Sequence, residues 1–132
     1  MPHFNLIAVL AAALSSFVLG GLWYSKLLFG AAWQRESGAP PADAKAAHPA
    51  RVFGVSFAFA LLAALAYAVL FSPAASLAEG AVRGFVVGLC VVGASFGINY
   101  QFANRSPQLW LIDAGYHAFQ FTLYGIVFRL LG

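Results

Sequence analysis

Charged residues are scarce in this 132-residue sequence, where they make up 8% of the chain while hydrophobic residues make up 62%. Soluble domains carry about 25% charged residues, because a surface that faces water needs charge to stay in solution. So few charges cannot cover a globule of this size, which excludes a soluble domain. Intrinsic disorder is also excluded, since aromatic residues alone make up 16% of the chain. The composition therefore predicts an integral membrane protein.

Cysteine and metal-ligand patterns are lacking as well. The one cysteine, Cys90, lies in an apolar run, so no disulfide can form within the chain. His3, His48 and His117 are far apart and have no cysteine or histidine neighbours at metal-binding spacings. The basic residues lie at the ends of hydrophobic segments and in one loop, whereas a nucleic-acid-binding protein gathers them on one face. We therefore expect no metal site, no cofactor and no nucleic-acid partner.

Four hydrophobic stretches are long enough to cross a bilayer. A helix rises about 1.5 Å per residue, so about 20 apolar residues span a hydrocarbon core about 30 Å thick. The four stretches cover about residues 4–28, 52–71, 77–103 and 107–131. We therefore predict an all-α fold in which residues 1–132 form a single domain, a bundle of four transmembrane helices. No Lys or Arg precedes Phe4, which argues against a cleavable secretory signal.

Local signals predict where the last two helices begin. Ser76 and Glu79 have the spacing of a capping box, so the third helix is expected to begin directly after Ser76. Glu79 and Arg83 are four residues apart and are expected to pair. Ser106 followed by Pro107 is typical of an N-cap and a first helical position. The connection before them is then very short, and the last two helices form a tight hairpin.

The distribution of lysine and arginine predicts the orientation. Residues 34–51 are the only long polar segment and are expected to form a solvated loop between the first two helices. This loop, the segment before it and the last turn hold Lys26, Arg35, Lys45, Arg51 and Arg105, and the opposite side holds Arg83 and Arg129. Short connections that are rich in these residues stay in the cytoplasm. We therefore predict a multi-pass protein of the bacterial cytoplasmic membrane, with the loop inside and both termini outside.

Small residues at four-residue spacing predict close helix packing. Gly80, Gly84 and Gly88 repeat along the third helix, and Gly20 continues a face of small residues on the first helix. Small residues let membrane helices approach closely. These glycines therefore pack the helices of one chain together, or one glycine face forms a homo-oligomer, and the two interpretations are compatible.

Polar residues within the predicted spans gather at one depth, near the side predicted to be cytoplasmic. Asp113 and His117 are four residues apart on the last helix and share a face. The short turn between the last two helices brings Asn99 to a similar depth. Trp33 and Trp110 lie near the same interface and fit an aromatic belt. The candidate site residues are Trp23, Tyr24, Asn99, Tyr100, Asp113 and His117.

Three interpretations of this cluster are open. It forms a hydrogen-bonded network that locks the helices together, since Asp113 can accept from Asn99, Tyr24 or His117. It forms a ligand site or proton path, because acids and histidines inside the membrane often mark these. Or Asp113 and His117 form a catalytic pair, although no serine or cysteine nucleophile is evident beside them. We assign no residue a catalytic role on these grounds.

Two stretches of the sequence resemble a known family. The first is Gly21-Leu22-Trp23-Tyr24-Ser25 followed by Leu28-Phe29-Gly30 and Trp33, and the second is Asn99-Tyr100 with Phe102 followed by Leu111-Ile112-Asp113-Ala114-Gly115-Tyr116-His117. Together they resemble the domain of unknown function 1761 family of small bacterial membrane proteins, over nearly the whole chain. The resemblance implies four membrane helices, and it implies no activity, substrate or catalytic residue. Lys26 stands where proline is usual in the family, so we expect the first helix to run on toward Phe29.

The sequence favours a non-enzymatic membrane component, either a binder of a small ligand or lipid or an accessory subunit, with the lipid bilayer as its partner. The alternative is a small transporter or proton-coupled carrier, which needs an oligomer because four helices are few for a monomeric carrier. A second alternative is a membrane enzyme that uses Asp113 and His117. A water-filled cavity that reaches Asp113 would favour transport or catalysis, and a dry, fully bonded cluster would favour the first function.

Overall fold

A computed structural model describes residues 5–39, 49–72 and 74–132 of the protein. Its helical segments are α1 (Leu6–Trp23), α2 (Gly30–Ser37), α3 (Pro49–Phe71), α4 (Leu77–Val86), the π-helical η1 (Val87–Gly93), α5 (Ala94–Phe102) and α6 (Pro107–Leu131). The prediction of an all-α fold is confirmed. Phe4, and residues 40–48 of the predicted loop, lie outside the described residues.

Three helical runs are long and apolar enough to cross a membrane. They are α1, α3 and the continuous run of α4, η1 and α5 from Leu77 to Phe102. The prediction of membrane-spanning helices is thus confirmed for these three in length and composition. The helix α6 has 25 residues but is less apolar, because it carries polar side chains such as Asp113, His117 and Gln120.

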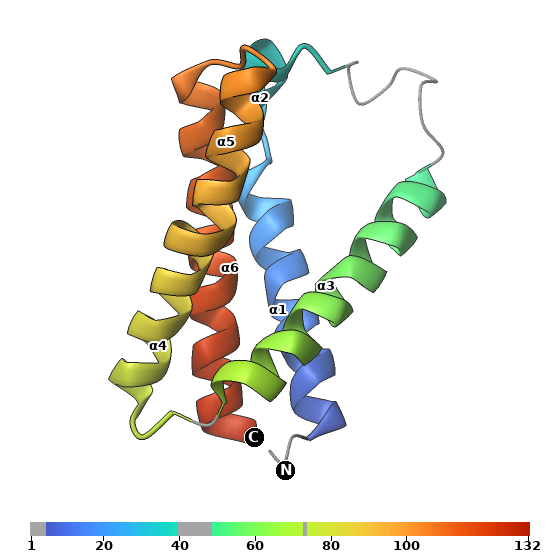
Figure 1. The fold of residues 1–132 in the computed structure, drawn as a ribbon. Coiled ribbons are helices and arrows are strands. Elements are labelled where there is room, and N and C mark those ends of the chain that lie inside the picture. The colour runs from blue at the N-terminus through green and yellow to red at the C-terminus, as the bar shows by residue number, and fades with distance from the viewer. Residues whose placement is uncertain (1–4, 40–48, 73) are drawn as a thin grey trace.

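The least apolar long helix, α6, is the central one. It contacts each of the other helical segments and runs along α1 and the α4–η1–α5 run (Figure 1). Ten of its residues are buried, whereas α1 buries five and α3 buries four. The other helices therefore cover the side chains of α6, including most of its polar ones.

The start of α1, the end of α6, the end of α3 and the start of α4 lie at one end of the structure, and α2 lies with the α5–α6 turn at the other (Figure 1). Arg129 belongs to the last turn of α6, at the first of these ends. Arg105 belongs to the α5–α6 turn at the opposite end. We call the end with α2 and this turn the hairpin end.

The first helix ends earlier than expected, and the expectation that it runs on toward Phe29 is wrong. It ends at Trp23, and a turn follows in which the Phe29 N–H donates to the Trp23 carbonyl at 3.0 Å. The chain then folds back so closely that a Cβ at position 30 would lie 2.4 Å from the Tyr24 carbonyl oxygen. Gly30 has no Cβ, so this turn forms even though Lys26 is not proline.

The short helix α2 was not predicted, and it takes up the first residues of the loop predicted for residues 34–51. It ends at Ser37, and Gly38 caps it with a φ of 69°, in the left-handed region that glycine adopts without strain. At the other end of the predicted loop, α3 begins at Pro49, because proline has no N–H to leave unpaired in a first helical turn. Residues 34–37 and 49–51 are therefore helical.

The predicted start signals of α4 and α6 are confirmed. The Ser76 hydroxyl accepts from the Glu79 N–H at 3.1 Å, and the Ser106 hydroxyl accepts from the N–H three residues later, also at 3.1 Å. The predicted pair of Glu79 and Arg83 is formed. The Glu79 carboxylate, however, bonds the N–H of Ala75 instead of that of Ser76, so the capping box is formed on one side only.

Gly80, Gly84 and Gly88 lie against the backbone of α6. A Cβ added to Gly84 would lie 2.0 Å from the Phe121 carbonyl oxygen, and one added to Gly88 would lie 2.2 Å from the His117 carbonyl oxygen. Cβ atoms essentially never come closer than 3.0 Å to another heavy atom. Only glycine therefore allows this approach, and the face that these residues form is used within the chain.

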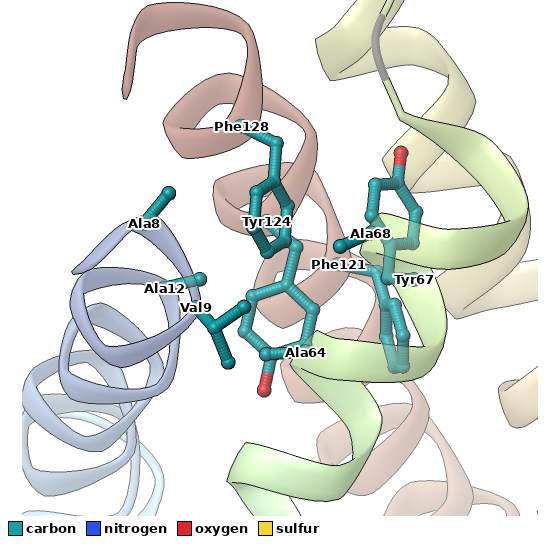
Figure 2. Packing of buried hydrophobic residues seen from close by; sticks show 9 residues of the cluster. All are labelled: Ala8, Val9, Ala12, Ala64, Tyr67, Ala68, Phe121, Tyr124 and Phe128. Atoms are coloured by element: carbon teal, nitrogen blue, oxygen red, sulfur yellow. The ribbon is translucent and has the colours of Figure 1, made fainter. Parts of the chain in front are cut away.

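Away from the hairpin end, an apolar core joins α1, α3 and α6. Figure 2 shows its members Ala8, Val9, Ala12, Ala64, Tyr67, Ala68, Phe121, Tyr124 and Phe128. The alanines of α1 and α3 let these helices approach α6, and the aromatic rings of α6 fill the space between them. Tyr124 lies between α1 and α3 and is completely buried (Figure 2). The N-terminal half of α3 is exposed by comparison.

Candidate functional site

Asp113 lies on the buried face of α6, and its side chain is tied to two tyrosines. The residue is 8% exposed. The Tyr24 hydroxyl donates to Oδ1 at 2.7 Å, and the Tyr100 hydroxyl donates to Oδ2 at 2.5 Å. Tyr24 directly follows α1 and Tyr100 belongs to α5. One carboxylate therefore connects three helical segments at a single point.

Two tryptophan indoles bind backbone carbonyls close to this carboxylate. The Trp23 Nε1–H donates to the carbonyl of Ile112 at 2.9 Å. The Trp110 Nε1–H donates to the carbonyl of Gly93 at 2.8 Å, at the residue where hydrogen bonding changes from the π-helical to the α-helical pattern. These bonds hold α1 and η1 against α6. A preference for the membrane interface is therefore not the only reason for the positions of Trp23 and Trp110, since each indole also bonds a backbone carbonyl.

A second polar chain runs along α6 on the same side as Asp113. His117 Nδ1 lies 2.5 Å from Gln120 Oε1, and Gln120 Nε2 donates to the Tyr124 hydroxyl at 2.9 Å. The Tyr124 hydroxyl donates in turn to the carbonyl of Ala60 in α3 at 3.1 Å. Gln120 Oε1 only accepts hydrogen bonds, so Nδ1 of His117 carries the hydrogen. His117 is thus partnered by Gln120, and the predicted bond to Asp113 is not formed.

Asn99 does not join the cluster, which corrects the expectation that it reaches Asp113. Its side chain is exposed, and within the described chain it donates no hydrogen bond to that carboxylate. The next residue, Tyr100, reaches Asp113 instead. Consecutive residues of a helix point about 100° apart, so only one of the two can face α6.

Three more polar residues lie on this side of α6 and were not among the predicted site residues, namely Tyr116, Gln120 and Tyr124. The Tyr116 hydroxyl donates to a backbone carbonyl of α1 at 3.0 Å, and Gly20 leaves room for the Tyr116 ring. A signal for them was present, because Asp113 and these residues recur every three or four positions, the spacing of one helix face. It was obscured because tyrosine is also common at membrane interfaces.

A pocket of about 250 Å³ opens between α5 and α6 at the hairpin end. Its lining includes Gly97, Tyr100, Gln101, Arg105 and Trp110. Tyr100 therefore belongs both to the pocket and to the bonds around Asp113. Gln101 and Arg105 were not among the predicted site residues, because nothing in the sequence shows that a groove forms beside them.

One charged residue, Arg105, lines the pocket, and a charged pair on α2 lies near its Ser106. The Arg105 Nη1–H donates to the Ser37 carbonyl at 2.9 Å, which docks the end of α2 onto the α5–α6 turn. Glu36 lies 3.3 Å from Arg35. The Ser106 hydroxyl and Arg35 lower the pKa of the Glu36 carboxyl, so Glu36 is ionised at neutral pH. This end of the protein carries charges of both signs.

The chemistry available at the cluster is mainly that of hydrogen bonding. Among the described residues, no buried side-chain nitrogen or oxygen lacks a hydrogen-bond partner. In the same part of the chain, no group of three or more His, Cys, Asp and Glu side chains is placed to hold a metal ion. Asp113 and His117 each bond a different partner, so they are not arranged as an acid–base pair.

The model of a family described as "Protein of unknown function (DUF1761)" matches residues 7–129, and the chain belongs to this family. The resemblance inferred from the sequence is thereby confirmed. Comparison with curated proteins and with solved structures finds no match.

Proposed function

We propose that this member of the family is a non-enzymatic component of the bacterial cytoplasmic membrane, with four spans that the Asp113 cluster ties together. The observation that carries the proposal is that both carboxylate oxygens of Asp113 are bonded to tyrosine hydroxyls, one following α1 and one on α5. A carboxylate that is partnered in this way supports the bundle, because both of its oxygens are already bonded to neighbouring segments of the chain.

The length of α6 and the burial of its polar side chains support it as the fourth membrane span, although its hydropathy is lower than that of the other long helices. Twenty-five residues reach about 37 Å, which exceeds a hydrocarbon core of about 30 Å. Asp113 and Gln120 are only 8% and 6% exposed, so neighbouring helices and not lipid would surround them. Arg129 lies in the last turn, where its long side chain can reach the headgroups. A helix in this position can cross the membrane because its neighbours satisfy its polar groups.

The distribution of basic residues supports a cytoplasmic hairpin end. In the sequence, Lys26, Arg35, Lys45, Arg51 and Arg105 fall in or beside the first and third predicted connections, whereas Arg83 and Arg129 fall on the other side. The positive-inside rule then places both termini outside the cell. This topology is a sequence-based proposal, and it is tested directly by labelling.

Cysteine labelling should report this topology. In a Cys90→Ala background, cysteines at Ala44 and Ala103 are expected to resist a membrane-impermeant thiol reagent in intact cells. A cysteine at Ala75 and one appended after Gly132 are expected to react. All four should react once the membrane is permeabilised, which is the control for accessibility. The reverse pattern would invert the topology, and matching reactivity at Ala103 and the appended cysteine would exclude a crossing by α6.

A transport or catalytic role gains less support from the described contacts. A proton path needs a continuous chain of groups that exchange protons, and Asp113 and His117 bond different partners. Beyond His117 the chain passes through the Gln120 amide, which donates and accepts hydrogen bonds but is not titratable. The chain of bonds is therefore better suited to fixing α6 against α3 than to moving a proton.

Two substitutions at Asp113 test its structural role. Asp113→Asn keeps the shape and one acceptor oxygen, so the free energy of unfolding should fall by less than about 1 kcal/mol, in line with polar contacts inside membranes. Asp113→Leu leaves both tyrosine hydroxyls without an acceptor and should cost about 1 to 3 kcal/mol more. Thermal unfolding in detergent measures both. A leucine variant as stable as the wild type would show that the carboxylate does not hold the helices together.

A further inference from the structure

We propose that the pocket between α5 and α6 binds the phosphate of a phospholipid headgroup. The proposal adds a ligand to the membrane role proposed above, and it rests on that role only in requiring that the chain lie in a bilayer. It depends on the lining of one pocket and not on the direction in which the helices cross. Four features of the pocket support it, namely its charge, its apolar wall, its size and its surroundings.

The positive charge of the pocket comes from Arg105, which belongs to its lining. A guanidinium has five N–H donors, and Nη1 of Arg105 donates to the Ser37 carbonyl at 2.9 Å. This bond anchors the guanidinium while other donors of the group are available for an anion. Arginine suits phosphate because two parallel N–H groups can bind two phosphate oxygens. Gln101, also in the lining, adds an amide that can donate to the same oxygens.

The apolar wall of the pocket is the ring of Trp110. Its Nε1–H is bonded to Gly93, so the indole offers the pocket its ring and not its donor. Gly97 also belongs to the lining, and a Cβ there would lie 3.2 Å from Trp110 Nε1, so glycine lets α5 lie close to the indole. Tryptophan is enriched at the level of the lipid headgroups. A wall of this kind is suited to the glycerol carbons beside a phosphate.

The size of the pocket suits a phospholipid headgroup, and the surface beside the pocket suits the acyl chains of the same lipid. Its volume of about 250 Å³ is that of about eight water molecules, since each occupies about 30 Å³ in the liquid. Pockets for drug-sized ligands are larger, at about 300–1,000 Å³. The residues that directly follow Gly97, Gln101 and Trp110 of the lining are apolar and exposed. Ile98 and Phe102 of α5 are 63% and 90% exposed, and Leu111 of α6 is 62% exposed. Acyl chains can lie along these residues.

One nearby charge opposes the binding of an anion and provides a second test. Glu36 is ionised and interacts with Ser106, which lines the pocket. Its interaction with Arg35 compensates this negative charge in part. Removing the charge at Glu36 should therefore strengthen binding, whereas removing the charge at Arg105 should weaken it. Opposite effects of two neighbouring substitutions are not expected from general damage to the fold.

The experiment measures thermal unfolding of the purified full chain in an uncharged detergent, with added short-chain phosphatidylglycerol. A ligand that binds only the folded state raises the unfolding temperature by an amount that grows with the logarithm of its concentration above its Kd. We expect phosphatidylglycerol to raise the unfolding temperature, and diacylglycerol with the same chains to have no effect. Arg105→Gln should raise the lipid concentration needed for a given rise in unfolding temperature at least about tenfold, since a hydrogen bond to a charged group contributes about that much. Glu36→Gln should lower it.

Matched variants and ligands decide the outcome. Arg129→Gln removes the same charge at the opposite end of the protein and should leave the response unchanged, and Arg105→Lys should retain part of it. Equal losses in Arg105→Gln and Arg129→Gln would show general attraction between charges and would overturn the proposal. An equal effect of diacylglycerol would also overturn it, and inorganic phosphate as effective as the lipid would replace the lipid by a free anion. The unfolding assay is done in detergent and does not depend on the orientation of the helices in the membrane. An error in the proposed topology would therefore appear only in the cysteine labelling of cells.

Discussion

Replacing Gly84 by alanine is expected to lower the free energy of unfolding by about 3 kcal/mol or more, the upper range for overpacking a core. The added Cβ would lie 2.0 Å from the Phe121 carbonyl oxygen and 2.6 Å from its carbon. Both are backbone atoms, which cannot rotate away as a side chain does. The helices α4 and α6 would have to separate, and the equally close contact between Gly80 and Gly125 would open with them.

Two other glycines provide matched controls for this substitution. Gly21 in α1 and Gly54 in α3 have no heavy atom within 4 Å of an added Cβ. Alanine is the better helix former by about 0.5–1 kcal/mol, so Gly21→Ala and Gly54→Ala should be neutral or stabilising. Thermal unfolding in detergent, followed by near-ultraviolet circular dichroism, compares the three variants. A Gly84→Ala protein with the stability of the wild type would contradict the close approach of α4 and α6.

Replacing Tyr124 by alanine is expected to cost about 3 kcal/mol, because it leaves a cavity where three helices meet. The residue is completely buried, and its ring lies 5.0 Å from that of Phe121 and 6.2 Å from that of Tyr67, between centroids. Lipid is about as apolar as this core, so the loss comes from packing contacts and not from transfer out of water. We expect α3 to become loose first, since Tyr124 holds it by both its ring and its hydroxyl.

Two further variants separate these contributions. Tyr124→Phe keeps the ring and removes the hydroxyl from the Ala60 carbonyl and the Gln120 amide, so it should cost about 1–2 kcal/mol. Phe59→Ala removes a ring that is 66% exposed and should change stability by less than about 0.5 kcal/mol. Unfolding of all three variants in the same detergent gives the comparison. If Phe59→Ala costs as much as Tyr124→Ala, the core does not lie between α1, α3 and α6.

Features that depend on neighbouring residues in the chain could be predicted from the sequence. Long apolar stretches predicted α1, α3 and the α4–η1–α5 run, because the backbone of a helix satisfies its own hydrogen bonds wherever the apolar run is long enough. Ser76 and Ser106 predicted the starts of α4 and α6, because an N-cap bond joins residues three apart. The low content of charged residues predicted a membrane protein, because composition can be read without knowing which residues are in contact.

Only the tertiary structure decided which polar groups meet. Asp113 was predicted to meet Asn99, and it meets Tyr100 instead, because the rotation of α5 about its axis is set by how the preceding run packs on α6. That packing depends on Gly84 and Gly88, whose contacts lie far from Tyr100 along the chain. The sequence placed the candidate residues at one depth, but the direction in which each side chain points follows from contacts between helices.

The sequence by itself determined that this chain is helical and suited to a membrane, and it located the polar residues near one end. The tertiary structure decided that α1 ends at Trp23, because Gly30 lets the chain fold back, and it decided that α6 is central. Hydropathy alone ranks α6 below the other long helices. Its polar side chains are acceptable there because the Tyr24 and Tyr100 hydroxyls and the Ala60 carbonyl, together with bonds among its own residues, supply the hydrogen bonds that lipid cannot.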